Sequence, residues 1–293
     1  MSQSFNKKLM PLILLCLTLI SGLFLIPILI TLTNSLMSPF EATTRYTITI
    51  TPENIFYQRG IINYVRMTLI PTMVTFSQYI RLLFGSPLYL NLFWNSVALT
   101  LPVIIGQLLI SVPAAYAFEF SKNKYKEILF VAYIIVMLLP LQVTLVPNFI
   151  VADFLNIRES YLAIILPGIF NPFGTFLIRQ FLKGLPQEYV ESMKVDGAGH
   201  LRIIASLIVP VMKPAIVAVL ILTFVEYWNL VDQAIVFIRD ASAIPLSVFL
   251  SRLSLERPDV IFAASVFYML PAVLIFLSGQ ENMIQGIQRS GIK

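Results

Sequence analysis

The chain has 293 residues, of which 58% are hydrophobic and only 12% are charged, and its mean hydropathy is +0.84. So little polar surface could not cover a soluble protein of this length, so the composition excludes that class and predicts an integral membrane protein. The net charge of +5 does not indicate nucleic-acid binding, because the basic residues are scattered between apolar runs and form no basic stripe.

The first apolar run, Leu9–Phe40, follows Lys7 and Lys8 in the manner of a signal peptide. The run is too long for a signal peptide and no small-x-small cleavage site follows it, so we predict a retained helix 1 over residues 9–33. Cys16, the only cysteine, lies in this run, which excludes an intrachain disulfide. We interpret it as a small residue that faces lipid or the protein core.

Residues 34–90 are the longest piece outside the apolar runs, and we predict a small extracytoplasmic loop region there. Thr43–Thr51 alternates polar and apolar residues, a pattern typical of a short strand. Residues 63–84 indicate one or two short helices in the membrane interface, broken at Pro71.

A helix needs roughly 20 apolar residues to cross about 30 Å of hydrocarbon, and five further windows meet this requirement. These predicted spans lie within Leu82–Phe118 (starting near Trp94), Ile128–Ala152, Ser160–Ile178, Val211–Val231 and Val260–Gln280. The apolar piece Ala241–Ser251 is too short to span and is predicted to lie in the interface. The fold class is therefore an all-α integral membrane protein with about six transmembrane helices, in a single membrane domain over residues 1–293.

Six spans place both termini on one side of the membrane, and the basic residues indicate which side. Most of them, including the short loop Lys122–Lys126, fall on the side of the termini. We therefore predict a multi-pass protein of the bacterial cell membrane with both termini in the cytoplasm.

Catalytic chemistry has no visible basis in this sequence. The single histidine, His200, has no second candidate ligand beside it, and no phosphate-binding loop or metal-ligand spacing occurs. We predict no catalytic residues, no metal site and no enzyme activity on this chain. A secondary carrier or channel for a small solute stays open as the alternative to a subunit of a larger transporter. Such a carrier would need inverted repeats or ionisable residues at mid-membrane, and only Glu226 comes close.

A charged, glycine-containing segment interrupts the apolar runs at residues 185–202. Pro186 suits the first turn of a helix, Gln187–Val195 can form that short helix, and Asp196-Gly197 is turn chemistry that ends it. Gly197 is expected to adopt a positive φ. Tyr189, Val190 and Met193 fall on one side of this helix. A short helix with one apolar side indicates docking into a groove of a partner, and a helix lying on lipid headgroups is the alternative.

Residues 185–210, "LPQEYVESMKVDGAGHLRIIASLIVP", resemble the cytoplasmic loop that marks the permease subunits of bacterial ABC importers. The residues in register with the family pattern are Glu191, Asp196, Gly197, Ala198 and Pro210. Ser192 and Met193 stand where the family usually has two alanines.

The resemblance extends almost continuously from residue 78 to residue 293. The further matching pieces are "NSVALT", "AAYAF", "LLPLQVTLVPNFIVADFLNI", "YWN" and the tail "QGIQRSGIK". The tail is similar to that of the carbohydrate-uptake branch, as in the smaller permease of the maltose importer. The resemblance places an ABC permease core at residues 91–282 and a cytoplasmic coupling loop at residues 185–202.

The resemblance implies a permease subunit that forms the translocation pathway of an ATP-driven sugar or oligosaccharide importer. It implies a second related permease, an extracellular solute-binding protein and two ATP-binding subunits that hold the ATP and Mg²⁺, with no cofactor on this chain. The residues it assigns to ATPase coupling are Glu188, Glu191, Met193, Asp196, Gly197 and Ala198. The aromatic pair Tyr227 and Trp228, with Asn229, gives candidate substrate contacts, and core packing is the alternative use of the two rings.

Overall fold

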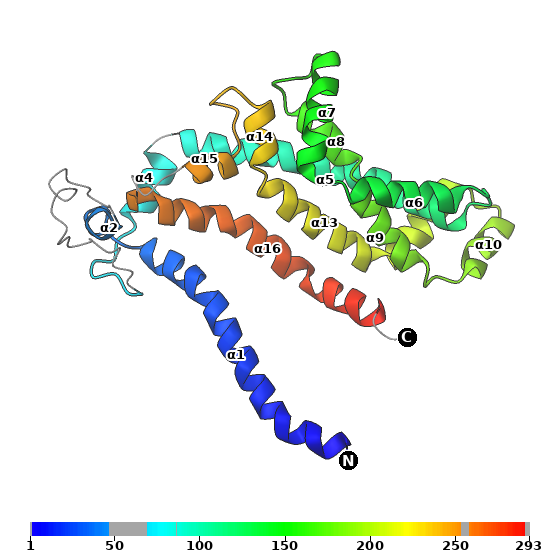
Figure 1. Ribbon diagram of the computed structural model, residues 1–293, viewed down its shortest axis with the longest axis horizontal. Helices are drawn as coiled ribbons and strands as arrows, with labels where there is room; N and C mark the ends of the chain where they lie inside the picture. Colours follow the sequence, from blue (N-terminus) through cyan, green and yellow to red (C-terminus); the bar gives the residue numbers. More distant parts are fainter. Residues whose placement is uncertain (1, 47–68, 86, 253–257, 291–293) are drawn as a thin grey trace. The chain divides into compact units, whose positions relative to one another are not determined.

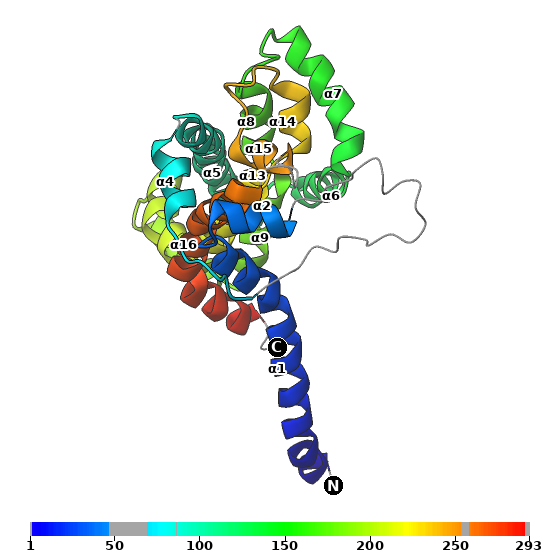
Figure 2. The same cartoon turned by 90° about the vertical axis from the view of Figure 1, so that its left-hand side faces the viewer.

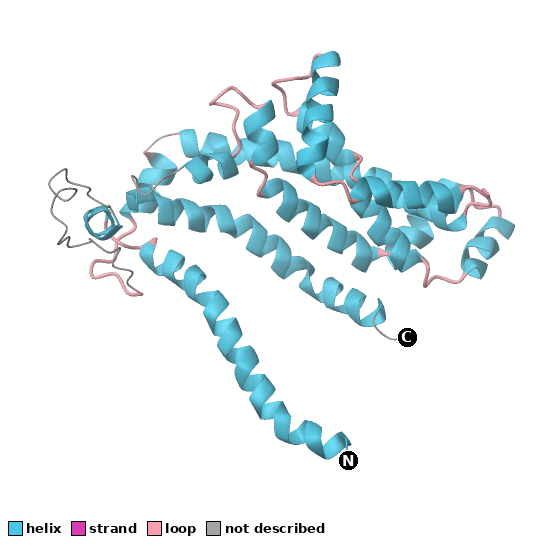
Figure 3. Cartoon of the chain, in the orientation of Figure 1, coloured by secondary structure: helices cyan, strands magenta, loops and turns pink. Residues whose placement is uncertain are grey.

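The computed structural model describes residues 2–46, 69–85, 87–252 and 258–290, and its regular elements there are helices (Figures 1 and 3). Within those ranges the only β pairing is an isolated bridge between Met37 and Val74. The all-α prediction is confirmed. The chain forms two compact units: the first comprises Met1–Tyr89 and Leu250–Met269, and the second comprises Leu90–Phe249 and Leu270–Lys293. The single membrane domain stays a prediction.

The first unit begins with α1 (Ser2–Asn34), which includes the predicted helix 1. Its apolar stretch Met10–Asn34 is long enough to span a membrane, and none of its most apolar window is buried by the rest of the chain. The unit also contains α2 (Pro39–Tyr46), α4 (Ser77–Phe84) and the beginning of α16 (Pro258–Ser290).

The predicted strand at Thr43–Thr51 is wrong in its first part, because residues 43–46 end α2. Tyr46 is buried and accepts a hydrogen bond from Asn34 Nδ2 at 2.6 Å, so a tertiary contact overrides the alternating pattern. The remainder of the predicted strand lies outside the described residues. A short helix does follow Pro71, since α4 begins at Ser77.

The second unit contains most of α5 (Leu88–Phe120), which begins six residues before the predicted start near Trp94. Pro87 immediately precedes α5. Proline is common at the beginning of a helix because its fixed φ already suits helical geometry. No proline then interrupts the helix before Pro102. The hydropathy pattern therefore located the apolar part of α5 but placed the beginning of the helix six residues too late.

The predicted third span is two helices, α6 (Lys126–Met137) and α7 (Leu141–Phe154), bent by 99°. Pro140 explains the break, because proline has no N–H to donate and disfavours helical geometry at the residue before it. The fourth span comprises α8 (Leu162–Ile169) and α9 (Pro172–Leu182), and Asn171 caps α9 by accepting a hydrogen bond from the Phe173 N–H.

After α10 (Gln187–Val195) the chain forms α11 (His200–Ile203), the π-helical turn η1 (Ile204–Ile208) and α12 (Val209–Val211). It then bends by 80° into α13 (Lys213–Trp228). Helix α13 lies within the predicted fifth window, Val211–Val231, and ends three residues before its last residue. The short helices α14 (Asp232–Phe237) and α15 (Leu246–Arg252) precede α16.

In the described part of the chain, four helices are long and apolar enough to cross a membrane, and six spans result if each bent pair counts as one. This agrees with the predicted number of about six. In the second unit α9 packs against α6 and α13, and α8 lies beside α7 and α14 (Figure 2).

Candidate coupling segment

The segment predicted to couple to a partner contains α10, and its C-terminus has a complete Schellman motif. The Ala198 N–H donates to the Met193 carbonyl at 2.9 Å, and the Gly197 N–H donates to the Lys194 carbonyl at 3.1 Å. Gly197 has φ +78°, which confirms the expected positive φ. An added Cβ there would meet no atom within 4 Å, so glycine is required by backbone conformation rather than by space.

The six predicted coupling residues divide between the two faces of this segment. Met193 and Ala198 are partly buried and pack against the apolar core of the second unit. The four exposed members are Glu188, Glu191, Asp196 and Gly197. The segment thus packs inward through Met193 and Ala198 and presents a mixed outer face, on which the acidic side chains lie beside Tyr189, Lys194 and Val195.

Val190 is the central inward contact of α10 and is only 1% exposed. Tyr189, expected on the same apolar side, is instead 57% exposed, which corrects that part of the prediction. The apolar residues that hold Val190, here called the α10 seat, come from α5, α9 and α11: Val112, Ala115, Tyr116, Ile178, Leu182 and Ile203. The seat joins α10 firmly to the helices that precede and follow it.

A recess of about 330 Å³ lies beside α10 at the end of α5. Its walls combine both signs of charge with apolar carbon, and the lining residues are Phe120, Lys122, Gln187, Val190, Glu191, Lys194 and Val195. Glu191 also accepts a hydrogen bond from Gln187 Nε2 at 2.6 Å. Lys122 was interpreted from the sequence only as a topology signal, so its place in this recess was missed.

His200, at the start of α11, contacts the same part of α5. Its Nδ1 lies 3.0 Å from the Tyr116 hydroxyl, and the two rings are 5.8 Å apart in an edge-to-face arrangement. At the other end of α5 the Ser96 hydroxyl accepts a hydrogen bond from the Leu246 N–H at 2.9 Å. Ser96 and Tyr116 are separated by about 30 Å of helix, which is the thickness of the hydrocarbon layer. The coupling segment and the chain around Leu246 therefore lie at opposite ends of α5, about one hydrocarbon thickness apart.

The candidate substrate contacts at the end of α13 are placed differently from one another. Trp228 is 2% exposed, stacks on Phe224 at 5.1 Å and meets Phe93 edge-on at 5.6 Å. Tyr227 is also buried, whereas Asn229 is exposed and donates to the Val225 carbonyl. Core packing accounts for both rings, and a substrate contact at these three residues stays a prediction.

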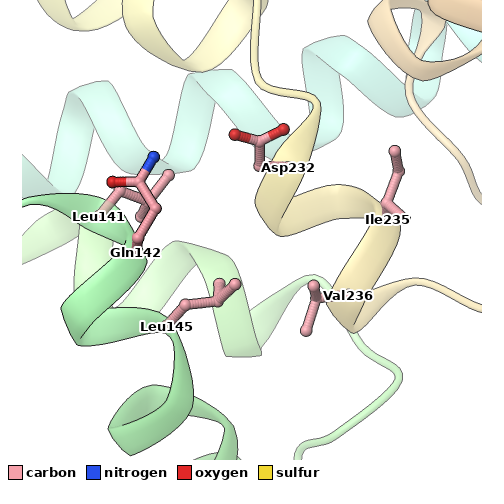
Figure 4. Close-up of a pocket in the computed structure, with 6 residues that line it drawn as sticks. All are labelled: Leu141, Gln142, Leu145, Asp232, Ile235 and Val236. Atoms are coloured by element: carbon pink, nitrogen blue, oxygen red, sulfur yellow. The ribbon is translucent and has the colours of Figure 1, made fainter.

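A second pocket, of about 300 Å³, lies between the beginning of α7 and α14 (Figure 4). Its walls are mostly apolar, with one amide and one carboxylate, and the lining residues are Leu141, Gln142, Leu145, Asp232, Ile235 and Val236. The pocket begins directly after the break at Pro140. Sequence reasoning missed it because its two walls are far apart along the chain. Among the described residues, no group of three or more His, Cys, Asp or Glu side chains could hold a metal ion.

Residues 92–289 match the family described as "Binding-protein-dependent transport system inner membrane component". The chain belongs to this family. That membership favours a transporter subunit over a carrier that works alone. The matched residues include α10, the α10 seat and the pocket between α7 and α14.

Two curated relatives illustrate the family. The chain is 32% identical over 228 residues to the arabinooligosaccharides transport system permease protein AraQ of Bacillus subtilis (strain 168), covering 76% of this chain and 80% of that protein. It is 28% identical to the sn-glycerol-3-phosphate transport system permease protein UgpE of Yersinia enterocolitica, covering 69% of this chain and 74% of the relative.

A solved structure shares the fold. A chain in the crystal structure of a bacterial ABC transporter involved in the import of the acidic polysaccharide alginate aligns with a TM-score of 0.76 at 20% identity. The alignment covers 95% of this chain and 97% of that one. The fold is therefore that of a type I ABC importer permease.

Proposed function

We propose that this chain is the permease subunit of an ATP-driven importer for a sugar or oligosaccharide. The observation that carries the proposal is α10, a short helix that packs on the bundle through Val190 and ends in a Schellman motif at Gly197. Its exposed face combines the carboxylates Glu188 and Glu191 with apolar side chains. The helix is built to fit the groove of a separate ATPase subunit. ATP and Mg²⁺ belong to that partner.

The importer has several further components. A second, related permease covers α1, whose most apolar window is unburied within this chain. Two ATPase subunits bind at the coupling segment and a solute-binding protein docks on the opposite face. The segments expected to contact the binding protein are residues 34–81 and 241–257, of which residues 47–68 and 253–257 lie outside the described residues.

The coupling segment faces the cytoplasm, with both termini on that side. In a Cys16→Ser background, Asn123→Cys is labelled by an impermeant thiol reagent only from the cytoplasm, and Asp240→Cys only from outside. Asn123 lies in the short basic loop before α6, and Asp240 lies in the exposed loop after α14. Reversed labelling would contradict the orientation.

The substrate class follows from the relatives, whose names refer to arabinooligosaccharides and sn-glycerol-3-phosphate. We infer a neutral oligosaccharide because AraQ is the more similar of the two over a larger share of the chain. The pocket between α7 and α14 supplies an amide and a carboxylate suited to hydroxyl groups, beside apolar carbon suited to a sugar ring.

The test is reconstitution of the whole complex in proteoliposomes, with the solute-binding protein added. The binding protein is loaded in turn with neutral oligosaccharides, a polyol phosphate and an acidic oligosaccharide, and ATP hydrolysis and uptake are measured for each. A neutral oligosaccharide stimulates ATP hydrolysis and is taken up. Stimulation only by another class would contradict the substrate assignment, and no stimulation by any of them would contradict the proposed function.

A further inference from the structure

One side chain of α9, Arg179, joins three helices near the coupling segment. Its Nε lies 3.1 Å from Glu119 Oε2 on α5, and its Nη2 lies 2.6 Å from Glu127 Oε1 on α6. The guanidinium also lies over the Phe130 ring of α6, 3.9 Å from the ring centroid. Arg179 is only 2% exposed, so a full positive charge is held inside the helix bundle.

Stability alone does not account for this arrangement. Moving a guanidinium and its partners out of water is costly, and well-packed apolar side chains often stabilise such a position as well or better. Arg179 Nη1 is buried and has no hydrogen-bond partner among the described residues. A buried donor without a partner is costly, so the arrangement of Arg179 is better explained by a role in which this nitrogen gains a partner when the helices move.

The two carboxylates differ in how firmly they are held. Glu119 is 23% exposed and lies in the last turn of α5, whereas Glu127 is 62% exposed and lies in the first turn of α6. Lys126 also ties the beginning of α6 to α5, because its Nζ donates to the Glu119 carbonyl at 2.7 Å. The more buried pair with Glu119 therefore keeps Arg179 on α5 and α9, and the pair with Glu127 is its ionic contact to α6.

The position of Arg179 links it to α10. Its neighbour on α9, Ile178, and the residue one turn further, Leu182, both belong to the α10 seat. On α5, Tyr116 belongs to the seat, and Glu119 follows it by three residues. The same two helices therefore hold α10 through one set of side chains and α6 through another.

We propose that Arg179 is a positioning residue that transmits movement of α10 to the broken span α6–α7. Displacement of α10 moves α5 and α9 as one body, and Arg179 carries α6 with them through Glu127. The movement reaches the bend at Pro140 and the pocket between α7 and α14 that follows it (Figure 4). The inference rests on the proposed function, in which the ATPase subunits drive α10.

Two variants test this role, together with a matched control. Arg179→Lys keeps the charge but loses the planar fork that reaches both carboxylates. Glu127→Gln keeps an acceptor oxygen but loses the charge, on a largely exposed side chain that tolerates the change. Asp153→Asn is the control, because Asp153 is 61% exposed and forms a single ion pair with Arg158 at 3.0 Å.

The measurement is sugar taken up per ATP hydrolysed in proteoliposomes, with copurified ATPase and the unfolding midpoint as parallel readouts. Arg179→Lys lowers uptake per ATP by about 5- to 150-fold, the usual range of coupling between sites, and Glu127→Gln lowers it less. Both variants retain the ATPase subunits and an unfolding midpoint close to wild type. Asp153→Asn matches wild type throughout.

Wild-type uptake per ATP in both variants would overturn the inference, as would a loss that only follows loss of assembled complex. If Arg179→Lys fails to insert, Glu127→Gln carries the test by itself. Failure of the proposed function is distinguishable, because then the wild-type chain itself would neither retain an ATPase nor couple hydrolysis to uptake.

Discussion

Helices α1 and α5 have the same length and similar composition but opposite surroundings. Each contains 33 residues and two internal prolines, and each includes a membrane-length apolar stretch. Yet 39% of the most apolar window of α5 is buried within the chain, against 0% for α1. Hydropathy therefore identifies a span without saying whether lipid, the same chain or another subunit surrounds it.

Polar side chains distinguish the two helices. α5 carries a buried series of them, Ser96, Thr100, Gln107 and Ser111. In α1, the hydroxyls of Thr18 and Thr31 donate to carbonyls four residues earlier in the same helix. Lipid tails are as apolar as leucine, so polar and small residues mark the contacts between helices in a membrane. α5 is thus an internal helix of the second unit, whereas the polar side chains of Thr18 and Thr31 bond only within α1.

Close packing gives the largest expected difference between the two helices. A Cβ added at Gly168 of α8 would lie 2.8 Å from Tyr227 Cζ and 2.9 Å from Val103 Cγ1 on α5, whereas one at Gly22 of α1 would meet nothing within 4 Å. Gly168→Val should destabilise the chain by about 1–3 kcal/mol through overpacking, and Gly22→Val should have no effect. Thermal unfolding of the isolated chain in detergent measures both. Equal midpoints for the two variants would remove the distinction.

A smaller difference is expected from single hydrogen bonds. The Thr223 hydroxyl of α13 donates to Gln107 Oε1 of α5 at 2.5 Å, between two buried side chains. Thr223→Val should cost about 1 kcal/mol of unfolding free energy. Thr18→Val in α1 removes only a bond within its own helix and should leave the unfolding midpoint unchanged. Denaturant unfolding of the two variants compares them, and a greater loss for Thr18→Val would refute the interpretation of α5.

The smallest effect concerns Glu41, just beyond α1. Burial alone would raise the pKa of this carboxyl. Hydrogen bonds from Thr72 and Met73, with Arg45 nearby, instead hold its pKa below 4.5. The charged form therefore stabilises the segment around Thr72 at neutral pH, and the contribution is lost as pH falls below 4.5 through the folded pKa.

Limited proteolysis of this segment as a function of pH measures the effect. Wild type should become more sensitive below pH 4.5, and Glu41→Gln should show the same sensitivity at every pH. A pH-dependent increase that persists in Glu41→Gln would assign the effect to another group.

The sequence predicted those features that depend on neighbouring residues. Six apolar windows marked the spans, and Asp196-Gly197 marked the end of α10 because a Schellman motif is built from local backbone bonds. The place and size of the 99° bend did not follow from the sequence, since Pro140 is one of several prolines in the predicted spans and its window also suits a straight helix.

Contacts between distant residues were beyond sequence reasoning. Glu119, Glu127 and Arg179 meet only when α5, α6 and α9 pack together. From the sequence, Arg179 was interpreted only as a basic residue that indicates membrane orientation. Its burial and its two partners depend on tertiary structure, which no local pattern encodes.

The central claim is that α10 couples this permease to an ATPase, and two glycines in the coupling segment test it most directly. An added side chain at either Gly197 or Gly199 would meet nothing within 4 Å, but only Gly197 has a positive φ, while Gly199 has φ −72°. A non-glycine residue at Gly197 costs on the order of 1–3 kcal/mol of backbone strain, which misdirects α10 without unfolding the bundle.

The measurement is binding-protein-stimulated uptake, with copurified ATPase, for Gly197→Val and Gly199→Val in proteoliposomes. Our account predicts that Gly197→Val inserts normally but loses ATPase association or uptake, while Gly199→Val retains both. Wild-type association and uptake in Gly197→Val would contradict the claim that α10 is the coupling element.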